Sequence, residues 1–559
     1  MNTVTTLTAP SAVVSGLDPY TGPWNHAQAA HLLRRTLFGP KKSEITETIG
    51  LGMSNALNQL LADPVPPSPP VNHFFTEDPN VPIGATWIES PNVPGVEVGQ
   101  YRRPSLRGWY WQNLLHHDFN IMSRMTMFWI NHFGMADVSE QRSQYQYINL
   151  FNEFGTGNYR TMIEKITVNP GMLEFLGGKD SNQWNPNENY ARELLELFTI
   201  QKGPAVSQGD YTFYTEDDIV PIARALTGWR IRGSWSTSRG VVESYFYENW
   251  HDPDPKQLSY RFDNVVINNT SNGGRDEYKD VIAVIFGKEE TARSFCRELY
   301  RFFVYYDITP QIENDVIGPL AQVLIAADFE IRPTLRALFG SQHFYDMAVR
   351  GPLIKSPYEF TVSMARTLGG FGHLGLDLAD NTNSNPQLLT AYQLGLSHHW
   401  RNSGMDMDFL YPPTVAGWKA YYQSPGYYRN WIGSATLKQR KKLVNSYTGA
   451  GIYTQENNSG DYLPRPFDLF QFVADLDDPY EAAELVAESV RIFLPRELHP
   501  NQLYSLKQQL LDGQMDQEWR IQYTDARANP FTSNIVNPVR NRLRKFFRAL
   551  FSLAEFNLM

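Results

Sequence analysis

The sequence predicts a mainly α-helical, multi-helical protein with a small antiparallel β insertion around residues 229–270. Three observations lead to this prediction. Apolar residues recur at helical spacing in most segments, and several of these segments begin with residues that cap helices. Residues 229–270 instead contain many aromatic and β-branched residues, which are typical of strands. No repeat of fixed period accompanies the helices, so they do not indicate a solenoid.

The first predicted helix is "WNHAQAAHLLRRTLFG", with Asn25 as its cap and Gly39 as its end. His31, Arg34 and Arg35 lie on one arc of this helix, and leucines occupy the opposite arc. This polar arc is either a solvated face or part of a binding site.

Residues 63–104 are rich in proline, asparagine and valine and show no periodicity. This composition predicts a long ordered loop, and loops of this length often cover functional sites. Helical segments then follow one another from Leu106 to about Phe198.

The segment "RMTMFWINHFG" predicts a helix that is apolar nearly all round, and such a helix is buried. Arg124, Asn131 and His132 nevertheless cluster on it, and buried polar groups need partners. Either an ion-pair network between helices or a polar cleft would supply them.

A further helix is predicted from Asn185 to Phe198, with Asn185 as the cap, Pro186 in the first helical position and Glu188 completing a capping box. Its polar side carries Asn189, Arg192, Glu193 and Glu196. This side either faces water or lines a cleft in which neighbouring carboxylates acquire shifted pKa values or hold a cation. In either case we expect Glu193 or Glu196 within ion-pair reach of Arg34, Arg35 or Arg124.

The next helix, "YTEDDIVPIARALTGW", has Thr215 as its predicted cap and a kink at Pro221. In the β insertion that follows, His251 and Asp252 form a loop pair in which neighbouring carboxylates can tune the histidine.

The predicted organisation has four parts: an N-terminal extension over residues 1–23, a helical region over 24–228, the β insertion over 229–274 and a second helical region over 275–559. Residues 398–433 form a loop-rich aromatic stretch within the last region.

Composition excludes some classes of function. A net charge of −10 over 559 residues argues against a broad nucleic-acid surface, and no segment has the roughly 20 apolar residues of a membrane span. No signal peptide is recognisable, so we expect a cytoplasmic protein or export together with a partner. The single cysteine, Cys296, lies among apolar positions and is expected to be a buried structural thiol.

The common catalytic signatures are missing from the sequence: it has no Walker loop, no dinucleotide-binding glycine motif, no His-Glu-x-x-His, no nucleophile elbow and no cysteine knuckle for a metal. The identity of any cofactor or metal is therefore unknown at this point.

A series of motifs resembles the bacterial domain-of-unknown-function 1800 family: "AAHLLRRTLFGP", "RMTMFWINHF", "NPNENYARELLELFTI", "YTEDDIVPIARALTGW", "RFFV", "RGPLIKSPYEF", "LYPPTVAGW" and "FSLAEF". The resemblance implies a large helical bacterial protein of unestablished activity. It also implies a neighbouring gene for an alkaline-phosphatase-like protein of the domain-of-unknown-function 1501 family. Ile130 stands where common family members have a histidine, which weakens a metal site on that turn.

Two hypotheses of function follow. We favour a non-catalytic partner or accessory protein of the alkaline-phosphatase-like neighbour, which binds through exposed aromatic residues of 398–433. The alternative is a hydrolase-like or lyase-like enzyme with His132, Glu193 and Glu196 as catalytic residues. Its candidate substrate-binding residues are His31, Arg34, Arg35, Arg124, Asn131, Asn189, Arg192, His251 and Asp252.

Overall fold

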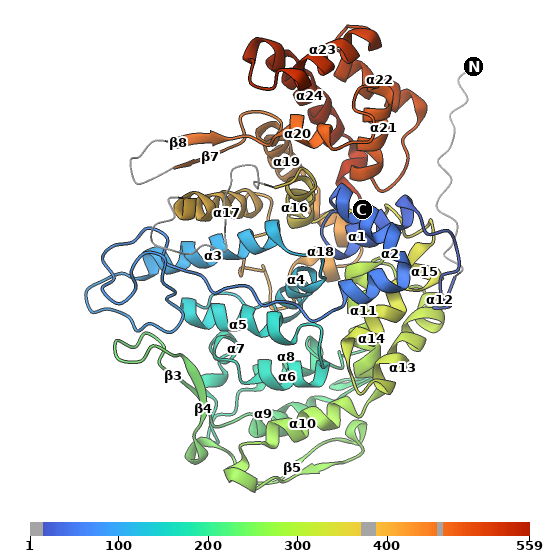
Figure 1. Ribbon diagram of the computed structural model, residues 1–559. Helices are drawn as coiled ribbons and strands as arrows, with labels where there is room; N and C mark the ends of the chain where they lie inside the picture. The colour runs from blue at the N-terminus through green and yellow to red at the C-terminus, as the bar shows by residue number, and fades with distance from the viewer. Residues whose placement is uncertain (1–14, 371–386, 456–461) are drawn as a thin grey trace.

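The structure, a computed structural model, describes residues 15–370, 387–455 and 462–559, and within them the protein is mainly α-helical, as predicted (Figure 1). The first helices are α1 (His26–Thr36), α2 (Lys42–Leu60), α3 (Gly99–His116), α4 (Met122–Phe133), α5 (Gln141–Phe154), α6 (Tyr159–Thr167), α7 (Pro170–Phe175), α8 (Glu188–Glu196) and α9 (Ile219–Ala225). The middle helices are α10 (Glu277–Phe286), α11 (Glu289–Phe303), α12 (Pro310–Ile312), α13 (Gly318–Ala326), α14 (Ile331–Phe339), α15 (Gln342–Tyr345), α16 (Pro357–Thr367), α17 (Gln387–Ser403) and α18 (Lys419–Tyr422). The C-terminal helices are α19 (Ser434–Tyr447), α20 (Leu469–Ala474), α21 (Ala482–Phe493), α22 (Pro500–Leu511), α23 (Asp516–Ala528) and α24 (Ser533–Phe551).

The strands pair into small two-stranded antiparallel sheets. The predicted β insertion is confirmed as two of them: β3 (Trp229–Arg232) with β4 (Glu243–Phe246), and β5 (Lys256–Gln257) with β6 (Val266–Ile267). Two further hairpins lie outside the insertion: β1 (Ala205–Ser207) with β2 (Asp210–Tyr211), and β7 (Ile452–Gln455) with β8 (Tyr462–Arg465).

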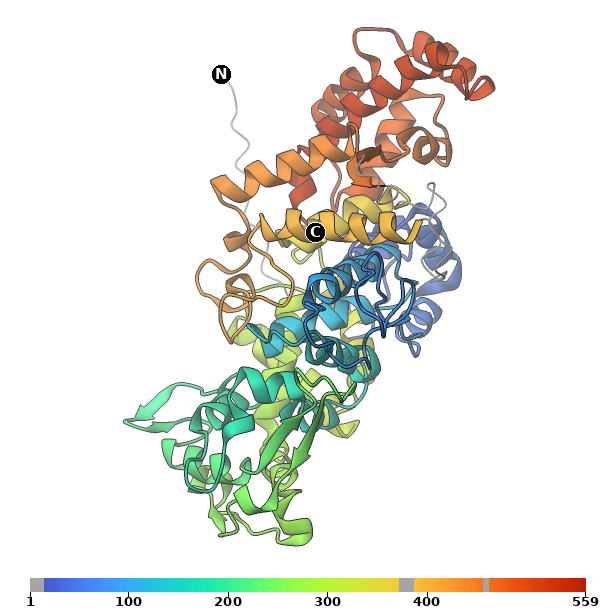
Figure 2. The same ribbon diagram turned by 90° about the vertical axis from the view of Figure 1, so that its left-hand side faces the viewer.

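The elements follow a long axis (Figures 1 and 2). Helices α20–α24 gather at one end, strands β3–β6 lie at the other, and α4 lies between them. Helix α17 runs along α3, and glycines allow their backbones to approach closely. A Cβ atom on Gly395 would lie only 2.4 Å from the carbonyl oxygen of Gly108, so no larger residue fits there without movement.

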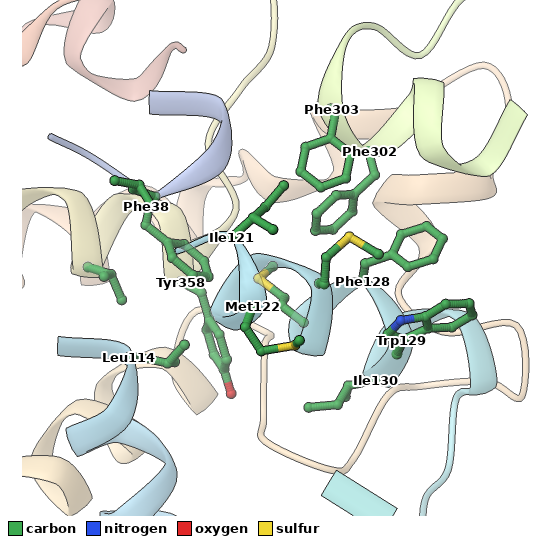
Figure 3. Close-up of a cluster of buried hydrophobic side chains, with 14 of the residues drawn as sticks. Phe38, Leu114, Ile121, Met122, Phe128, Trp129, Ile130, Phe302, Phe303 and Tyr358 are labelled. Carbon is green, nitrogen blue, oxygen red and sulfur yellow. The ribbon is translucent and has the colours of Figure 1, made fainter. Parts of the chain in front are cut away.

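Helix α4 is buried on every side, as its composition predicts. Met125, Trp129 and Phe133 expose none of their surface. Figure 3 shows the apolar side chains around this helix, which come from α3, α11, α16 and the turn after α1: Leu114, Phe302, Phe303, Tyr358 and Phe38. Because α4 touches several helices at once, any polar group on it must be satisfied inside the protein.

Several local predictions are confirmed. The Asn25 side chain caps α1 by accepting a hydrogen bond from the Ala27 N–H, and Cys296 is fully buried, which raises the pKa of its thiol. The segment after residue 63 is an ordered loop that closes on Asn72, whose side chain donates to the carbonyl oxygens of Phe75 and Val81. The loop is shorter than predicted, because α3 begins at Gly99 and includes Pro104.

The predicted cap of α8 was wrong by two residues. The cap is Asn187, whose Oδ1 accepts a hydrogen bond from the Tyr190 N–H at 3.0 Å. Asn185 instead closes a turn with Asn182. Both asparagines suit a cap, and tertiary contacts select between them, since Asn187 Nδ2 also donates to the Leu176 carbonyl oxygen at 2.8 Å.

The aromatic stretch 398–433 starts inside α17 and is largely buried. Its buried members are Phe409, Trp418, Tyr421, Tyr428 and Trp431. Trp400, Tyr411 and Tyr422 remain exposed, with 58%, 36% and 37% of their surface accessible.

The selection of Asn187 as the cap gives a matched pair of substitutions. Asn187→Ala should lower the free energy of unfolding by about 0.5–2 kcal/mol, because the helix loses its side-chain cap. Asn185→Ala should change it by less than about 0.5 kcal/mol, as exposed substitutions usually do. Urea denaturation of both variants measures the difference, and equal effects would show that Asn187 does not act as the cap.

Burial also sets how the protein responds to acid. Burial lowers the pKa of nine of the twelve histidines: His26, His31, His73, His116, His117, His132, His343, His398 and His399. In the unfolded chain these side chains bind a proton below a pH of about 6.5. Between pH 6.5 and about 4 the unfolded state therefore binds more protons than the native state.

The free energy of unfolding should consequently fall as the pH falls through this window. Urea midpoints measured at pH 7.5, 6 and 5 should decrease steadily. His132→Gln should reduce the dependence of the unfolding free energy on pH by up to about 1.4 kcal/mol per pH unit, because the variant lacks this titrating group. A midpoint that stays constant from pH 7.5 to 5 would refute this expectation.

Candidate functional site

The polar face of α8 pairs with the loop that follows it. Arg192 binds both carboxylate oxygens of Glu216, with Nη1 to Oε1 at 2.9 Å and Nη2 to Oε2 at 2.8 Å. Glu196 lies 3.6 Å from Arg192 and accepts a hydrogen bond from Lys202 Nζ at 3.1 Å. These four side chains are 22–38% exposed, and Asn189 is exposed as well. The face is thus a partly solvated ion-pair network.

Glu193 differs from its neighbours on this face. No hydrogen bond or ion pair joins its carboxylate to another residue in the described part of the chain. Burial and the nearby Glu196 raise the pKa of Glu193, and Arg192 opposes this shift. A carboxyl group that keeps its proton to higher pH has the property of a general acid.

His132 contacts the turn after α8 through the carbonyl group of Phe198. Its Nε2 lies 3.4 Å from the carbonyl oxygen of Phe198, and its ring stacks on Phe128 with 5.7 Å between the centroids. Burial lowers the pKa of His132 to about 4, and the hydrogen bond to Phe198 offsets this only in part. The imidazole is therefore neutral near pH 7 and packs α4 against the end of α8.

Asn131, which precedes His132 in α4, fixes the loop that contains "LYPPTVAGW". Its Oδ1 accepts a hydrogen bond from the Trp418 N–H at 2.9 Å. A Cβ atom on Gly417 would lie 2.3 Å from the Asn131 carbonyl oxygen, and Gly417 has a φ of 84°, so glycine is required at this contact. The Asn131 side chain thus positions the backbone of this loop.

Arg124 forms a buried ion pair with Glu359. Its Nη1 lies 2.5 Å from Glu359 Oε1, and the two side chains are 0% and 1% exposed. The other oxygen of Glu359 accepts a hydrogen bond from the Ser356 N–H and so caps α16. The guanidinium also lies 4.7 Å from the ring centroids of Phe38 and Phe302. One carboxylate thereby joins α4 to the start of α16.

The arginines of α1 bind main-chain oxygens instead of carboxylates. Arg35 is fully buried and donates to the oxygens of Val304, Val349 and Met559 at 2.7–3.2 Å. Arg34 donates to the carbonyl oxygens at the C-terminal end of α21, residues 491 and 492. His31 Nε2 lies 2.9 Å from the Phe344 carbonyl oxygen. The polar arc of α1 is therefore an interior surface.

Two further cations complete this region, which we call the basic core: Arg34, Arg35, Arg124, Lys355 and Arg440 around Glu359. Lys355 Nζ lies 4.1 Å from the ring centroid of Phe556, and Arg440 donates to the Lys355 carbonyl oxygen at 2.6 Å. Burial lowers the pKa of Arg34 to about 9 and that of Arg35 and Arg440 to about 10. Glu359 offsets the shift for Arg35, Arg440 and Lys355.

His251 and Asp252 belong to a separate cluster beside α9 and α10. Asp252 accepts two hydrogen bonds from Arg224 at 2.7 and 2.9 Å, which help to lower its pKa against the effect of burial. His251 Nε2 lies 3.2 Å from Glu277, and Lys256 Nζ lies 2.5 Å from the same carboxylate. Every charged group of this cluster has a partner, so it stabilises the β insertion.

The structure thus distributes the predicted residues over three places: the face of α8, the basic core with α4, and the His251 cluster. The predicted ion pair between Glu193 or Glu196 and an arginine of α1 or α4 was wrong, because Arg124 pairs with Glu359 and Glu196 pairs with Arg192 and Lys202.

Sequence reasoning missed the acidic partners Glu216, Glu277 and Glu359. Only Glu359 left a signal, since "SPYE" has the form of a capping box. The same carboxylate contacts Arg124, which lies 235 positions earlier in the sequence. A local sequence pattern cannot predict a contact at this distance along the chain.

Residues of the Pro-rich loop line a cavity of about 490 Å³. Pro66, Trp109, His116, Thr126 and Tyr392 are among its lining residues, and none of the predicted catalytic residues lines it.

Within the described ranges, no three histidine, cysteine or acidic side chains are arranged to hold a metal ion. In the same part of the chain, no helix has both the length and the apolar character needed to cross a bilayer.

Substitution of Arg124 should measure how much the buried ion pair with Glu359 contributes to the free energy of unfolding. Arg124→Met leaves the Glu359 carboxylate buried and unpaired, which should cost about 3–5 kcal/mol of unfolding free energy. Arg192→Met removes a partly solvated pair and should cost no more than about 1 kcal/mol. The double variant Arg124→Met with Glu359→Gln should recover most of the loss, because glutamine is neutral and can still cap α16. Similar losses in both single variants would contradict this account.

Comparison with known proteins supports the family resemblance that the sequence motifs indicate. Searches of the curated proteins and of the solved structures find no match. A family model described as "Protein of unknown function (DUF1800)" matches residues 31–558, which is nearly the whole chain. The motifs that carry the resemblance therefore belong to one continuous unit, and the protein is a member of the DUF1800 family.

Proposed function

We propose that the protein is a non-catalytic accessory protein that binds an alkaline-phosphatase-like partner of the domain-of-unknown-function 1501 family. The proposed setting is a cell-surface or polymer-processing system, which the chain reaches together with that partner. The main support is that the candidate residues for chemistry are engaged inside the fold: Arg35 and Arg124 bind internal acceptors, and His132 faces a carbonyl oxygen.

These contacts are a poor basis for catalysis. Arg124 is fully buried beside Glu359, so a substrate anion could reach it only if the interior around this ion pair opened, and breaking a buried pair costs several kcal/mol. A general base must be close in pKa to the working pH, and burial holds the pKa of His132 at about 4. The same contacts hold together a rigid body, which is a suitable platform for binding another protein.

The three exposed aromatic residues of 398–433 are the proposed contacts. Trp400 is the largest of them, and its ring lies 5.2 Å from the guanidinium carbon of Arg107 on α3. Tryptophan and arginine are enriched among the residues that dominate protein interfaces. Tyr411 and Tyr422 complete the proposed set.

Analytical ultracentrifugation of the purified chain with the alkaline-phosphatase-like protein tests this proposal. We expect a complex, and Trp400→Ala should weaken it about tenfold or more, as interface tryptophans often do. Trp184→Ala is the matched control, because Trp184 is 73% exposed and lies outside residues 398–433. It should leave the affinity unchanged.

The absence of a complex, or equal effects of the two tryptophan substitutions, would overturn the proposal. The enzyme alternative has one observation in its favour, the half-buried Glu193 with its raised pKa. It would be preferred if an activity screen, with and without divalent metals, found a reaction that Glu193→Gln abolishes and Glu188→Gln preserves. Glu188 is an exposed residue of the same helix.

A further inference from the structure

An open groove lies among the C-terminal helices and is lined by residues of α23, α24 and the turn after α19. Helices α23 and α24 lie at one end of the molecule (Figure 1). The groove has a volume of about 1260 Å³. It contains none of the residues discussed above, and its walls are mainly polar and charged.

Arg542, on α24, is the unusual residue of this groove. Only 5% of its surface is exposed, yet its side chain makes no hydrogen bond and no ion pair with any residue that the structure describes. Its Nη1 is buried without a partner, and its nearest aromatic neighbour is Trp519, 5.6 Å from ring centroid to guanidinium carbon. Burial lowers the pKa of Arg542, and Asp512 and Glu518 offset this effect.

The other buried arginines of the described chain differ from Arg542 in their hydrogen bonding. Each of them donates at least one hydrogen bond: Arg34, Arg35, Arg102, Arg124, Arg142, Arg350, Arg366 and Arg440. The loss of water at Nη1 is costly, because no acceptor replaces that water. Arg542 also lines the groove, and the other nitrogens of its guanidinium are not closed off, so an acceptor from outside the chain would bind there and compensate part of this cost.

The rest of the groove suits an anion that also carries hydroxyl groups. Arg544 and Arg548 line it without carboxylate partners, since they donate to Asn541 and Thr448. Lys545 is paired with Asp512 at 2.5 Å. Amide and hydroxyl side chains, which bind sugar hydroxyls, make up much of the remaining wall: Gln514, Gln522, Ser533, Asn534, Asn537 and Asn541.

We propose that this groove is a binding site for an acidic saccharide, and that Arg542 binds the carboxylate or phosphate group of that ligand. A guanidinium offers two parallel hydrogen bonds to either group. A single-stranded nucleic acid fits less well, because Trp519 is fully buried and cannot stack on a base, and Asp512 and Asp525 would repel a chain of phosphates.

Isothermal titration of the full-length protein with three probes tests the proposal. Trigalacturonate carries carboxylates, glucose 6-phosphate carries a phosphate, and cellotriose is neutral. We expect at least one acidic probe to bind and cellotriose not to bind, and the acidic probe that binds identifies the anionic group. Arg542→Gln and Arg544→Gln should each weaken that binding, Arg542→Gln by about tenfold or more.

Arg520→Gln is the matched control. Arg520 lies on α23, is exposed, pairs with Glu481 and does not line the groove, so its loss should leave binding unchanged. Arg544→Gln keeps the test valid if Arg542→Gln does not fold, because Arg544 is not buried.

Thermal melting gives an independent readout. Arg542→Met should raise the melting temperature of the ligand-free protein, since it removes a buried charge without a partner. The acidic probe should stabilise the parent protein and should stabilise this variant much less. The proposal is overturned if neither acidic probe binds, if cellotriose binds equally well, if Arg542→Gln and Arg544→Gln bind like the parent, or if a single-stranded oligonucleotide binds more tightly than both acidic probes.

Discussion

The burial of a charge on α4 is the constraint on which the rest of the structure depends. Arg124 lies at the centre of the protein, where an ion without a partner would cost several kcal/mol. Glu359 provides that partner, and the same carboxylate caps α16. The positions of α4 and α16 are therefore coupled, and the aromatic rings of α11 pack around the guanidinium of the pair.

Around this pair, arginine side chains act as connectors between segments that are distant in sequence. Arg35, Arg34 and Arg440 bind main-chain oxygens, which are present whatever side chain a position carries. A guanidinium is well suited to this role because it has five donors in a fixed plane. Motifs at residues 29–40, 301–304 and 350–360 thus meet in one interior region. Their shared location gives a structural reason for their occurrence together in one family.

Local sequence patterns predicted the helices but not their partners. The apolar circumference of α4 correctly predicted its burial, and with it the need of Arg124 for an internal acceptor. The choice of Glu359 over Glu196 depends on the tertiary fold, because several acidic residues suit the role equally well by type. The cap of α8 was misplaced for a related reason, since Asn185 and Asn187 both satisfy the local rule and a contact with Leu176 selects one. For Arg542 no pattern could help, because the lack of a partner is visible only when all neighbours are in place.

The contacts of Arg35 also bear on the order in which the chain can fold during synthesis. This residue lies in the first helix, and its acceptors follow it by 269, 314 and 524 positions. Helix α1 leaves the ribosome early, yet its arginine cannot reach all of its acceptors until the chain has been made up to Met559. The N-terminal part must therefore wait in an incomplete state with polar groups and apolar surface unsatisfied, a condition in which growing chains aggregate or bind chaperones. Completion of the interior is therefore a late step, because it joins helix α1 to residues made much later.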